Sequence, residues 1–347
     1  MTDEKPIKKI LIFRLGSIGD FLISLPSLYL IRKKYPQATI GLLTNGPTDS
    51  RIATAASVLD GIGYVDQYIR YLTCKRNLRS LLSLRAQIRS FDAELLVYLA
   101  ERRGALPLIR DYGFFWLCGF RRIVFPTFNP MRWSHQPPAA GCARWEREAH
   151  RIGRMISAIG SVDIDRPESW DLHLSPTEHD EANRLLSGGN MSGRAEDFKL
   201  IALSVGTKQS INDWGDKNWA EVIEGLRPLK YGLVLIGGKE DHGRSEKLAA
   251  RWQGPVLNLC GKASPRVTAA VLKKVTVLLC HDSGPMHLAA SVGTRCVAVF
   301  SKRNQFGMWY PFGSGHKIFY PCWKMGTIQS IRPRPVIAAI RELLRAA

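Results

Sequence analysis

Short apolar strand patterns alternate with helical patterns along this chain, and the alternation limits its fold more than any other feature. Such alternation is typical of a parallel sheet covered by helices on both faces. The predicted strands form two sets, 9–13, 39–44, 64–69, 94–99 and 122–125, then 200–205, 232–236, 256–259, 275–280 and 296–300. We therefore expect an α/β protein with two doubly wound, Rossmann-like domains.

The length of the chain supports two domains, because 347 residues exceed one comfortable hydrophobic core. Residues 161–176 lack helical periodicity and are the predicted linker. We expect an N-terminal domain over residues 1–170 and a second domain over residues 171–330. Apolar side chains at helical spacing in residues 331–347 predict a closing C-terminal helix.

Cysteine usage and the N-terminus bear on the compartment. The seven cysteines are an odd number without a C-x-x-C pair, which indicates reduced thiols and neither a disulfide framework nor a zinc site. The first residues are charged and pass directly into a strand pattern, unlike a secretory signal. No apolar run approaches the roughly 18 residues that span a bilayer. We expect a cytoplasmic protein.

The formal net charge of +19 predicts a negatively charged partner. Much of the excess lies in residues 70–154, which carry a net +10, and in residues 301–347, which carry a net +7. An acidic acceptor, an anionic membrane or nucleic acid would each suit it. If a helix begins at Arg144, then Arg147, Arg151 and Arg154 share one face with it. That face is either solvated or binds an acidic partner.

A turn of small residues, Arg14-Leu-Gly-Ser-Ile-Gly-Asp20, follows the first strand pattern. Gly16 and Gly19 permit close backbone approach, and a helix begins near Asp20. A strand, such a turn and a helix N-terminus together make an anion site. Asp20 either caps the helix or takes part in chemistry. The turn lacks the G-x-G-x-x-G pattern, so a nicotinamide dehydrogenase is not expected.

A second turn, His281-Asp-Ser-Gly-Pro-Met-His287, follows the strand pattern at 275–280. Pro285 suits the first position of a helix. Asp282 either binds sugar hydroxyls, or Asp282 and His287 pair with each other or with backbone groups. The backbone N–H groups predicted to hold a diphosphate are those of Ser283, Gly284, Met286 and His287. Two such turns in two similar halves suggest a ligand held between domains.

Two further loops follow predicted strands, at the edge where open α/β sheets bind ligands. The loop after 200–205 offers hydroxyls and one cation for phosphate oxygens, from Thr207, Lys208 and Ser210. The loop after 232–236 offers Glu240 and Asp241 as acceptors for a ribose. Asp163-Ile-Asp165 has the D-x-D pattern of metal-dependent sugar transferases but lies in the predicted linker, so no metal is expected.

The turns together resemble glycosyltransferase family 9, the ADP-heptose:lipopolysaccharide heptosyltransferases. Residues 14–20 match the family's R-[LF]-G-[SA]-[IL]-G-D turn, and residues 282–287 match its D-[ST]-G-x-x-H turn. The family's K-x-W-x-x-x-x-[WF] segment corresponds to Asn212 through Trp219, with Asn212 in place of the cation. Stabilisation of the phosphates then passes to Lys208 or uses another donor geometry.

The resemblance implies a GT-B architecture with two Rossmann-like domains facing a central cleft. It implies inverting, metal-independent transfer of heptose from ADP-heptose to an anionic saccharide such as lipopolysaccharide inner core. The N-terminal domain would bind the acceptor and the second domain the donor. Carried over by motif, Asp20 is the general base, Thr207 and its loop contact diphosphate, Glu240 or Asp241 holds ribose, and Asp282 binds the donor sugar. Ser283, Gly284 and His287 complete the diphosphate site. We assign Gly16, Ser17, Arg147, Arg151 and Arg154 to the acceptor.

No cofactor beyond the nucleotide sugar is expected. We expect contact with a glycolipid acceptor and with the anionic inner face of the inner membrane, and no nucleic acid. Two other classes stay open, a GT-B-like sugar-nucleotide epimerase and a non-catalytic nucleic-acid-binding protein. An epimerase would release product with no acceptor present, and a nucleic-acid-binding protein would show salt-sensitive duplex binding.

Overall fold

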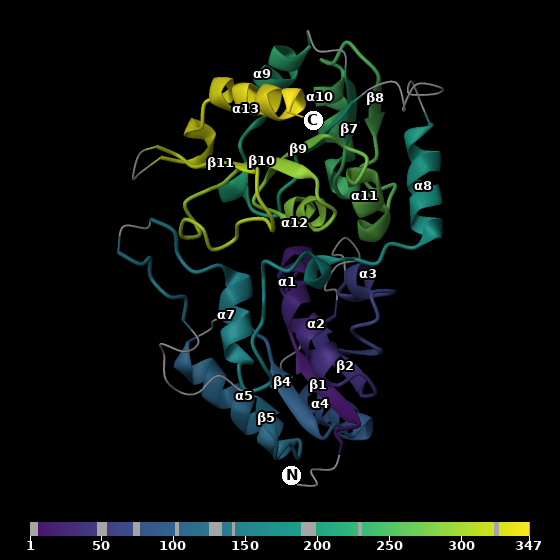
Figure 1. Cartoon of the computed structure of the whole chain (residues 1–347), viewed down its shortest axis with the longest axis vertical. Coiled ribbons are helices and arrows are strands. Elements are labelled where there is room, and N and C mark those ends of the chain that lie inside the picture. Colours follow the sequence, from purple (N-terminus) through teal and green to yellow (C-terminus); the bar gives the residue numbers. More distant parts are fainter. Residues whose placement is uncertain are drawn as a thin grey trace. The chain divides into compact units, whose positions relative to one another are not determined.

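The computed structural model describes residues 6–46, 54–71, 77–100, 104–124, 134–140, 143–188, 199–227, 231–322 and 326–346. The chain divides into two compact units, Met1–Trp170 (unit 1) and Asp171–Ala347 (unit 2). Each unit has its own parallel sheet with helices packed against it (Figure 1). The units are described separately below.

The sheet of unit 1 has the strand order β3-β2-β1-β4-β5, and all its neighbouring strands are parallel. Its strands are β1 Lys9–Phe13, β2 Thr39–Asn45, β3 Gln67–Tyr71, β4 Leu95–Tyr98 and β5 Ile123–Val124. The strand expected at 64–69 begins three residues later. Tyr64 and Val65 precede the strand but are buried, which explains the apolar pattern at these two positions. The Asp66 carboxylate, next in the chain, accepts a hydrogen bond from the Ile40 N–H at 2.7 Å.

Helices cover both faces of this sheet. They are α1 Ile18–Ile23, α2 Leu25–Lys34, α3 Ala56–Leu59, α4 Leu78–Phe91, α5 Ala105–Leu117, α7 Glu148–Met155 and the 3₁₀ turn η1 Pro167–Trp170. Pro26 lies in the first turn of α2, which explains why the expected helix from Asp20 is interrupted at Ser24. On β1, Leu11 and Phe13 pack in one cluster with apolar residues of α4 and α5, while α2 contacts α7 and η1.

The sheet of unit 2 has the order β11-β10-β9-β6-β7-β8, again with parallel neighbours. Its strands are β6 Leu200–Ser204, β7 Gly232–Leu235, β8 Val256–Asn258, β9 Val277–His281, β10 Arg295–Val299 and β11 Lys317–Phe319. The five expected strands are present within two residues. The sequence analysis missed β11, because three half-buried residues are too few to show a period.

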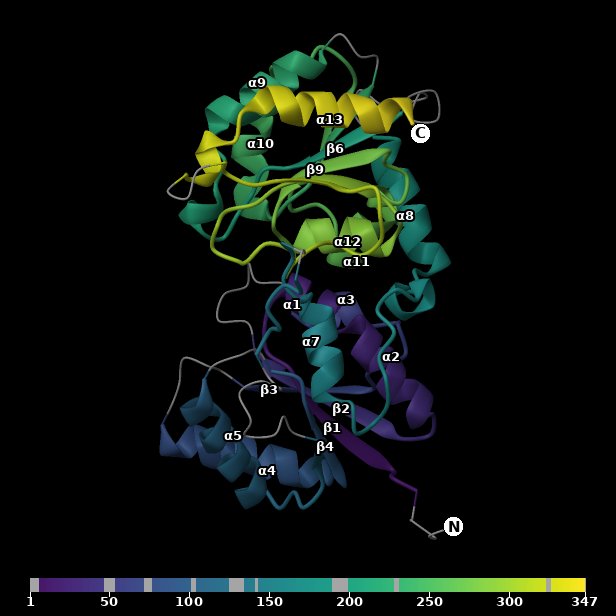
Figure 2. The same ribbon diagram turned by 60° about the vertical axis from the view of Figure 1, so that its left-hand side comes forward.

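The helical elements of unit 2 include the expected closing helix. They are α8 Pro176–Leu186, η3 Ser210–Asn212, α9 Asp216–Leu226, η4 Lys239–Asp241, α10 His242–Ala249, α11 Pro265–Leu272, α12 Gly284–Ser291, η5 Ile328–Ser330 and α13 Pro333–Arg345. The apolar side of α13, with Val336, Ile340 and Leu343 buried, packs on α9 and on the sheet (Figure 2). The small-residue stretch 188–193, whose composition predicts a surface loop, lies outside the described residues beyond Gly188. None of the helices within the described ranges has the length and apolar character needed to cross a membrane.

Candidate functional site

Both sheets reverse their strand order about their first strand, and this reversal places the candidate residues. In unit 1 the order turns between β1 and β4, and in unit 2 between β6 and β9. Connections leave such a point in opposite directions, and open α/β sheets bind ligands there, outside the carboxyl ends of the strands. The turn that contains Asp20 follows β1, the loop of Thr207 follows β6, and the turn of Asp282 follows β9. Glu240 and Asp241 follow the neighbouring strand β7.

Asp20 caps the start of α1. Its Oδ2 accepts hydrogen bonds from the Ser17 N–H at 2.7 Å and from the Ser17 hydroxyl at 3.1 Å. Gly16 has φ of +147°, and a Cβ there would lie 2.4 Å from the Cβ of Asp20. The Gly16 N–H donates to Asn45 Oδ1 at 2.8 Å, which ties the turn to the end of β2. The Asp20 carboxylate is therefore held against the Gly16 backbone. Capping of α1 and a role of Asp20 in the reaction are both compatible with this position.

A fully buried arginine lies behind Asp20. The Arg14 guanidinium donates from Nη1 to the carbonyl of Leu99 at 2.7 Å and from Nη2 to the carbonyl of Asp20 at 3.1 Å. Its Nη2 also lies 3.6 Å from Asp20 Oδ1. Leu99 directly follows β4, so this side chain bridges the two strands at which the sheet reverses.

A second buried carboxylate, Glu148 of α7, also lies near the Arg14 guanidinium. Arg151 donates from Nε and from Nη2 to the two oxygens of Glu148, each at 2.6 Å. Glu148 also lies 2.9 Å from His135 Nε2 and 3.9 Å from Arg14 Nη1. Burial by itself would raise the pKa of Glu148, but the hydrogen bonds and charge of Arg151, with His135 and Arg14, lower it to about 2. Glu148 is therefore ionised, and the two arginines are its counterions.

This network corrects the expected basic face. α7 begins at Glu148 and not at Arg144, and Arg151 is only 1% exposed. Arg154 is paired with Glu146, Nε to Oε1 at 2.6 Å. The prediction of one exposed cationic stripe was wrong because the interleaved Glu146 and Glu148 draw the arginines inward. Arg147, at the N-cap of α7, stays half-buried.

In unit 2 the sheet reversal holds His281, the last residue of β9. Its Nε2 accepts from the Trp214 N–H at 3.1 Å, and its Nδ1 lies 3.3 Å from the carbonyl of Gly206. Burial lowers the pKa of His281 to about 4, so the ring is neutral near pH 7 and donates from Nδ1. Trp219 packs edge-on against it at 5.2 Å between ring centroids. His281 thus fixes the loop that carries Thr207, Lys208 and Ser210.

The tryptophan segment is part of the core. Trp214 and Trp219 are fully buried and meet edge to face, with centroids 5.3 Å apart. The Trp214 indole N–H donates to the carbonyl of Ile331 at 2.9 Å. Asn212, which stands where the family has a cation, accepts from the Ser301 hydroxyl at 2.6 Å. It therefore joins the loop after β6 to the loop after β10.

The loops after β6 and β7 also meet closely. A Cβ on Gly206 would lie 2.1 Å from Asp241 Oδ2, so only glycine fits there. The same Oδ2 accepts from the Gly238 N–H at 2.9 Å. Burial, with the neighbouring charge of Glu240, raises the pKa of Asp241. Asp241 is thus committed to the turn, whereas the side chain of Glu240 is exposed.

The turn after β9 supports part of the predicted anion site. Asp282 Oδ2 accepts from Asn304 Nδ2 at 3.1 Å, and Ser283 is the N-cap of α12. The Met286 N–H donates to the carbonyl of Ser283 at 3.1 Å. The prediction of a free donor at Met286 was therefore wrong, because the first helical turn already uses it. His287 is buried, edge-on to Trp309 with centroids 6.4 Å apart.

Sequence reasoning missed Arg244 of α10, which organises these loops. Its Nη2 donates to Asp213 at 2.9 Å, its Nε to Asp216 at 2.6 Å, and its Nη1 to the carbonyl of Val205 at 3.1 Å. Partial burial would raise the pKa of Asp213, but the hydrogen bond from Arg244 lowers it. No spacing in the sequence distinguishes this arginine from the many exposed ones.

Two other features do not form part of the candidate site. Asp163 Oδ1 accepts from the Asp165 N–H at 3.0 Å, an ordinary local turn. Across the part of the chain that the structure describes, no three His, Cys, Asp or Glu side chains gather as metal ligands.

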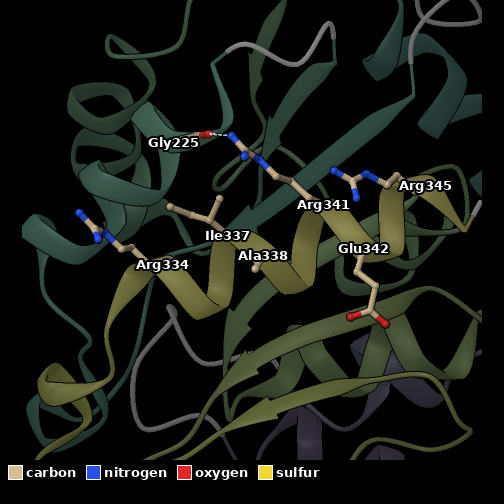
Figure 3. A pocket seen from close by; sticks show the side chains of 7 residues that line it. All are labelled: Gly225, Arg334, Ile337, Ala338, Arg341, Glu342 and Arg345. Carbon is tan, nitrogen blue, oxygen red and sulfur yellow. Dashed lines mark hydrogen bonds between the residues drawn. The ribbon is translucent and has the colours of Figure 1, made fainter.

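A surface hollow lies along α13, where Arg341 donates to the carbonyl of Gly225 at 2.7 Å (Figure 3). It is lined by residues of α9 and α13 and by none of the candidate loops.

Comparison with known proteins identifies the family and the fold. The sequence profile of glycosyltransferase family 9 (heptosyltransferase) matches residues 143–320. The chain belongs to glycosyltransferase family 9. It is 23% identical over 314 residues to the lipopolysaccharide core heptosyltransferase OpsX of Haemophilus influenzae, covering 86% of this chain and 80% of that protein.

Two solved structures share the fold. A family 9 glycosyltransferase from Veillonella parvula superposes with a TM-score of 0.78 at 18% identity, covering 99% of each chain. Escherichia coli ADP-heptose lipopolysaccharide heptosyltransferase II gives 0.67 at 16% identity, covering 97% of this chain and 99% of that one. The expected GT-B fold of two Rossmann-like domains is confirmed. This chain is a heptosyltransferase-like glycosyltransferase.

The buried pair in α7 predicts unequal effects of two charge reversals. Arg151→Glu places a carboxylate against Glu148 and removes its main counterion, so we expect a loss of about 3–5 kcal/mol, the cost of breaking a buried ion pair. Arg147→Glu, four residues earlier, should change stability by less than about 0.5 kcal/mol. Chemical unfolding followed by circular dichroism measures both. Equal stability of the two variants would show that the Glu148–Arg151 pair is not part of the folded core.

The neutral ring of His281 predicts a pH dependence of stability. Its pKa falls from the ordinary 6.5 to about 4 on folding, so between these values the unfolded chain binds a proton that the folded chain does not. Stability is therefore lost as pH falls through this window, by roughly 2 kcal/mol at pH 5. Thermal unfolding at pH 7 and pH 5 should show the loss in wild type and in His150→Gln, and a smaller loss in His281→Gln. The same loss in His281→Gln would contradict the assignment.

Proposed function

We propose that this enzyme transfers heptose from ADP-heptose to an anionic saccharide of the lipopolysaccharide core, with inversion and without a metal. The observation that carries the proposal is that each family motif lies at a reversal of strand order, the Asp20 turn in unit 1 and the Thr207 and Asp282 loops in unit 2. The names of the relatives support the substrates, since one is a lipopolysaccharide core heptosyltransferase and another an ADP-heptose enzyme.

Unit 2 is the proposed donor-binding domain. The start of α12, with the backbone N–H groups of Ser283 and Gly284, would face the diphosphate, because a helix N-terminus favours negative charge. The loop after β6 adds the hydroxyls of Thr207 and Ser210 and the exposed cation of Lys208. His281 holds this loop through the carbonyl of Gly206. We assign His287 to packing beneath the turn, because its side chain is buried.

The two acids near the donor sugar and ribose have separate roles in this proposal. Asp282 would accept hydrogen bonds from sugar hydroxyls, and Asn304 orients its carboxylate at 3.1 Å. Of the two ribose candidates we favour Glu240, since its side chain is exposed while Asp241 is held in the turn by the Gly238 N–H.

The chemistry follows from inversion. An acceptor hydroxyl attacks the anomeric carbon on the side opposite the diphosphate, and its proton passes to the Asp20 carboxylate. The bond from that carbon to the diphosphate oxygen breaks, so that ADP leaves with a growing negative charge. The α12 N-terminus and Lys208 would stabilise this charge. Our remaining candidates for acceptor binding are Gly16, Ser17 and Arg147. We no longer assign Arg151 and Arg154 to the acceptor, because Arg151 is buried and Arg154 is paired with Glu146.

The place of action is also a proposal. We propose that the enzyme works in the cytoplasm at the inner face of the inner membrane, where a lipid-linked acceptor would be available. The described cysteines support a reducing compartment, since Cys118, Cys260, Cys280, Cys296 and Cys322 are unbridged.

The role of Asp20 is tested by Asp20→Asn, which keeps an oxygen for the Ser17 N–H and removes the base. We expect turnover to fall by about 10²-fold or more while the melting temperature and ADP-heptose affinity change little. Asp165→Asn, a carboxylate removed from a local turn, is the matched control and should retain full activity. Turnover near wild type in Asp20→Asn would reduce Asp20 to a helix cap. Conversion of ADP-heptose without acceptor would indicate an epimerase.

Metal independence is tested by chelation. The proposed donor site balances the diphosphate with a helix N-terminus and Lys208, so transfer should survive excess EDTA with less than about a twofold change in rate. Lys208→Met should then slow transfer, because the site has no other cation proposed for the diphosphate. Loss of activity in EDTA that Mg²⁺ or Mn²⁺ restores would overturn the proposal and return attention to Asp163 and Asp165.

A further inference from the structure

Helix α5 is apolar on both its sides. Its inner side packs in the core through Leu108 and Phe115. Its outer side exposes Leu106 by 80%, Ile109 by 53% and Trp116 by 50%. These three lie at positions i, i+3 and i+10, which place them on one face of a helix. A helix that is apolar all round is normally buried, and the described residues leave this outer face exposed.

Helix α4 extends the apolar surface. Its first turns expose Leu78 by 73% and Leu82 by 54%, one helical turn apart. Arg85 of α4 donates from Nε to the carbonyl of Leu117 at the end of α5, at 3.0 Å, so the two helices are neighbours on one face of the sheet (Figure 2). We call the exposed side chains of both helices the α4–α5 surface. Single exposed leucines are common, but several large apolar side chains exposed on two neighbouring helices indicate an interaction site.

Cations border this surface. The guanidinium of Arg121 lies over the Trp116 ring at 5.4 Å from its centroid. Arg79 and Arg89 of α4 are exposed. Within these two helices, both fully described, the one acidic residue is Asp111. It is buried and accepts from the Tyr98 hydroxyl at 2.9 Å and from Arg110 at 2.6 Å. The border therefore presents positive charge to whatever covers the apolar side chains.

We propose that the α4–α5 surface docks on an anionic lipid bilayer. Leucine, isoleucine and tryptophan side chains enter the boundary between head groups and acyl chains, and the arginines bind lipid phosphates. Arginines near a membrane surface are attracted by anionic lipid. A second copy of the chain is a poorer cover, because a twofold contact would bring arginines against arginines with no exposed carboxylate of these helices to pair them. This inference rests on the proposed place of action at the inner membrane and names the surface that binds there. Sugar transfer is not needed to observe the docking.

Vesicle binding of the full-length chain tests this surface. Co-sedimentation would use vesicles of phosphatidylcholine alone and vesicles with 30 mol% phosphatidylglycerol, without donor or acceptor. We expect the wild type to bind the anionic vesicles and the triple variant Leu106→Ser/Ile109→Ser/Trp116→Ser to bind them at least tenfold more weakly. Ile211→Ser, which removes an apolar side chain of unit 2 that is 61% exposed, is the matched control and should bind like wild type.

A second variant keeps the proposal testable if the triple variant unfolds. Arg79→Gln/Arg121→Gln leaves the apolar side chains in place and should weaken binding to anionic vesicles by roughly tenfold, with no change in melting temperature. Wild-type binding by both variants, or no binding by the wild type, would overturn the proposal. So would a concentration-dependent dimer that the triple variant abolishes, which would assign the surface to a second copy. Because no sugar is present, failure here leaves the proposed transfer reaction untouched.

Discussion

Where a parallel sheet reverses its strand order, the loops after its two central strands leave in opposite directions. The rest of each unit depends on what fills the gap between these loops, beyond the carboxyl ends of the paired strands. Unit 1 fills it with the buried guanidinium of Arg14, which donates to the carbonyls of Leu99 and Asp20. A buried cation requires carboxylates near it, and Glu148 and Asp20 supply them. Unit 2 fills the gap with the neutral ring of His281, which needs one donor and one acceptor and finds them in Trp214 and Gly206. The same topology has two electrostatic solutions.

The two units also share a close contact between a glycine and a carboxylate, in the loop that follows the first strand of each unit. In unit 1 the Asp20 carboxylate lies against Gly16, and in unit 2 the Asp241 carboxylate lies against Gly206. In both places a side chain on the glycine would collide with the acid. Each acid also accepts a backbone N–H of its own turn, from Ser17 and from Gly238. The likeness of the two halves therefore reaches the level of single contacts, although their proposed ligands differ.

The sequence predicted the sheets well because buried parallel strands are runs of apolar residues with turns between them. It predicted the motif loops because glycines and acids directly follow those strands. It failed where the outcome depended on partners far away in the chain. The arginines of α7 have the spacing of an exposed stripe, and only the fold shows that Glu148 draws Arg151 inward. Nor does the sequence show that Ser283 already occupies the N–H of Met286, or that Arg244 joins Asp213 to Asp216.

Arg14 has a consequence for how such an enzyme can change during evolution. The same guanidinium supports the sheet of unit 1 and lies 3.6 Å from the carboxylate proposed as the base. Selection for a stable fold and selection for a correctly placed base therefore act on one side chain, and neither property can drift alone. New acceptor preferences should arise instead from side chains that do not support the core, such as the half-buried Arg147. The proposed chemistry and the choice of acceptor would then reside in physically separate residues.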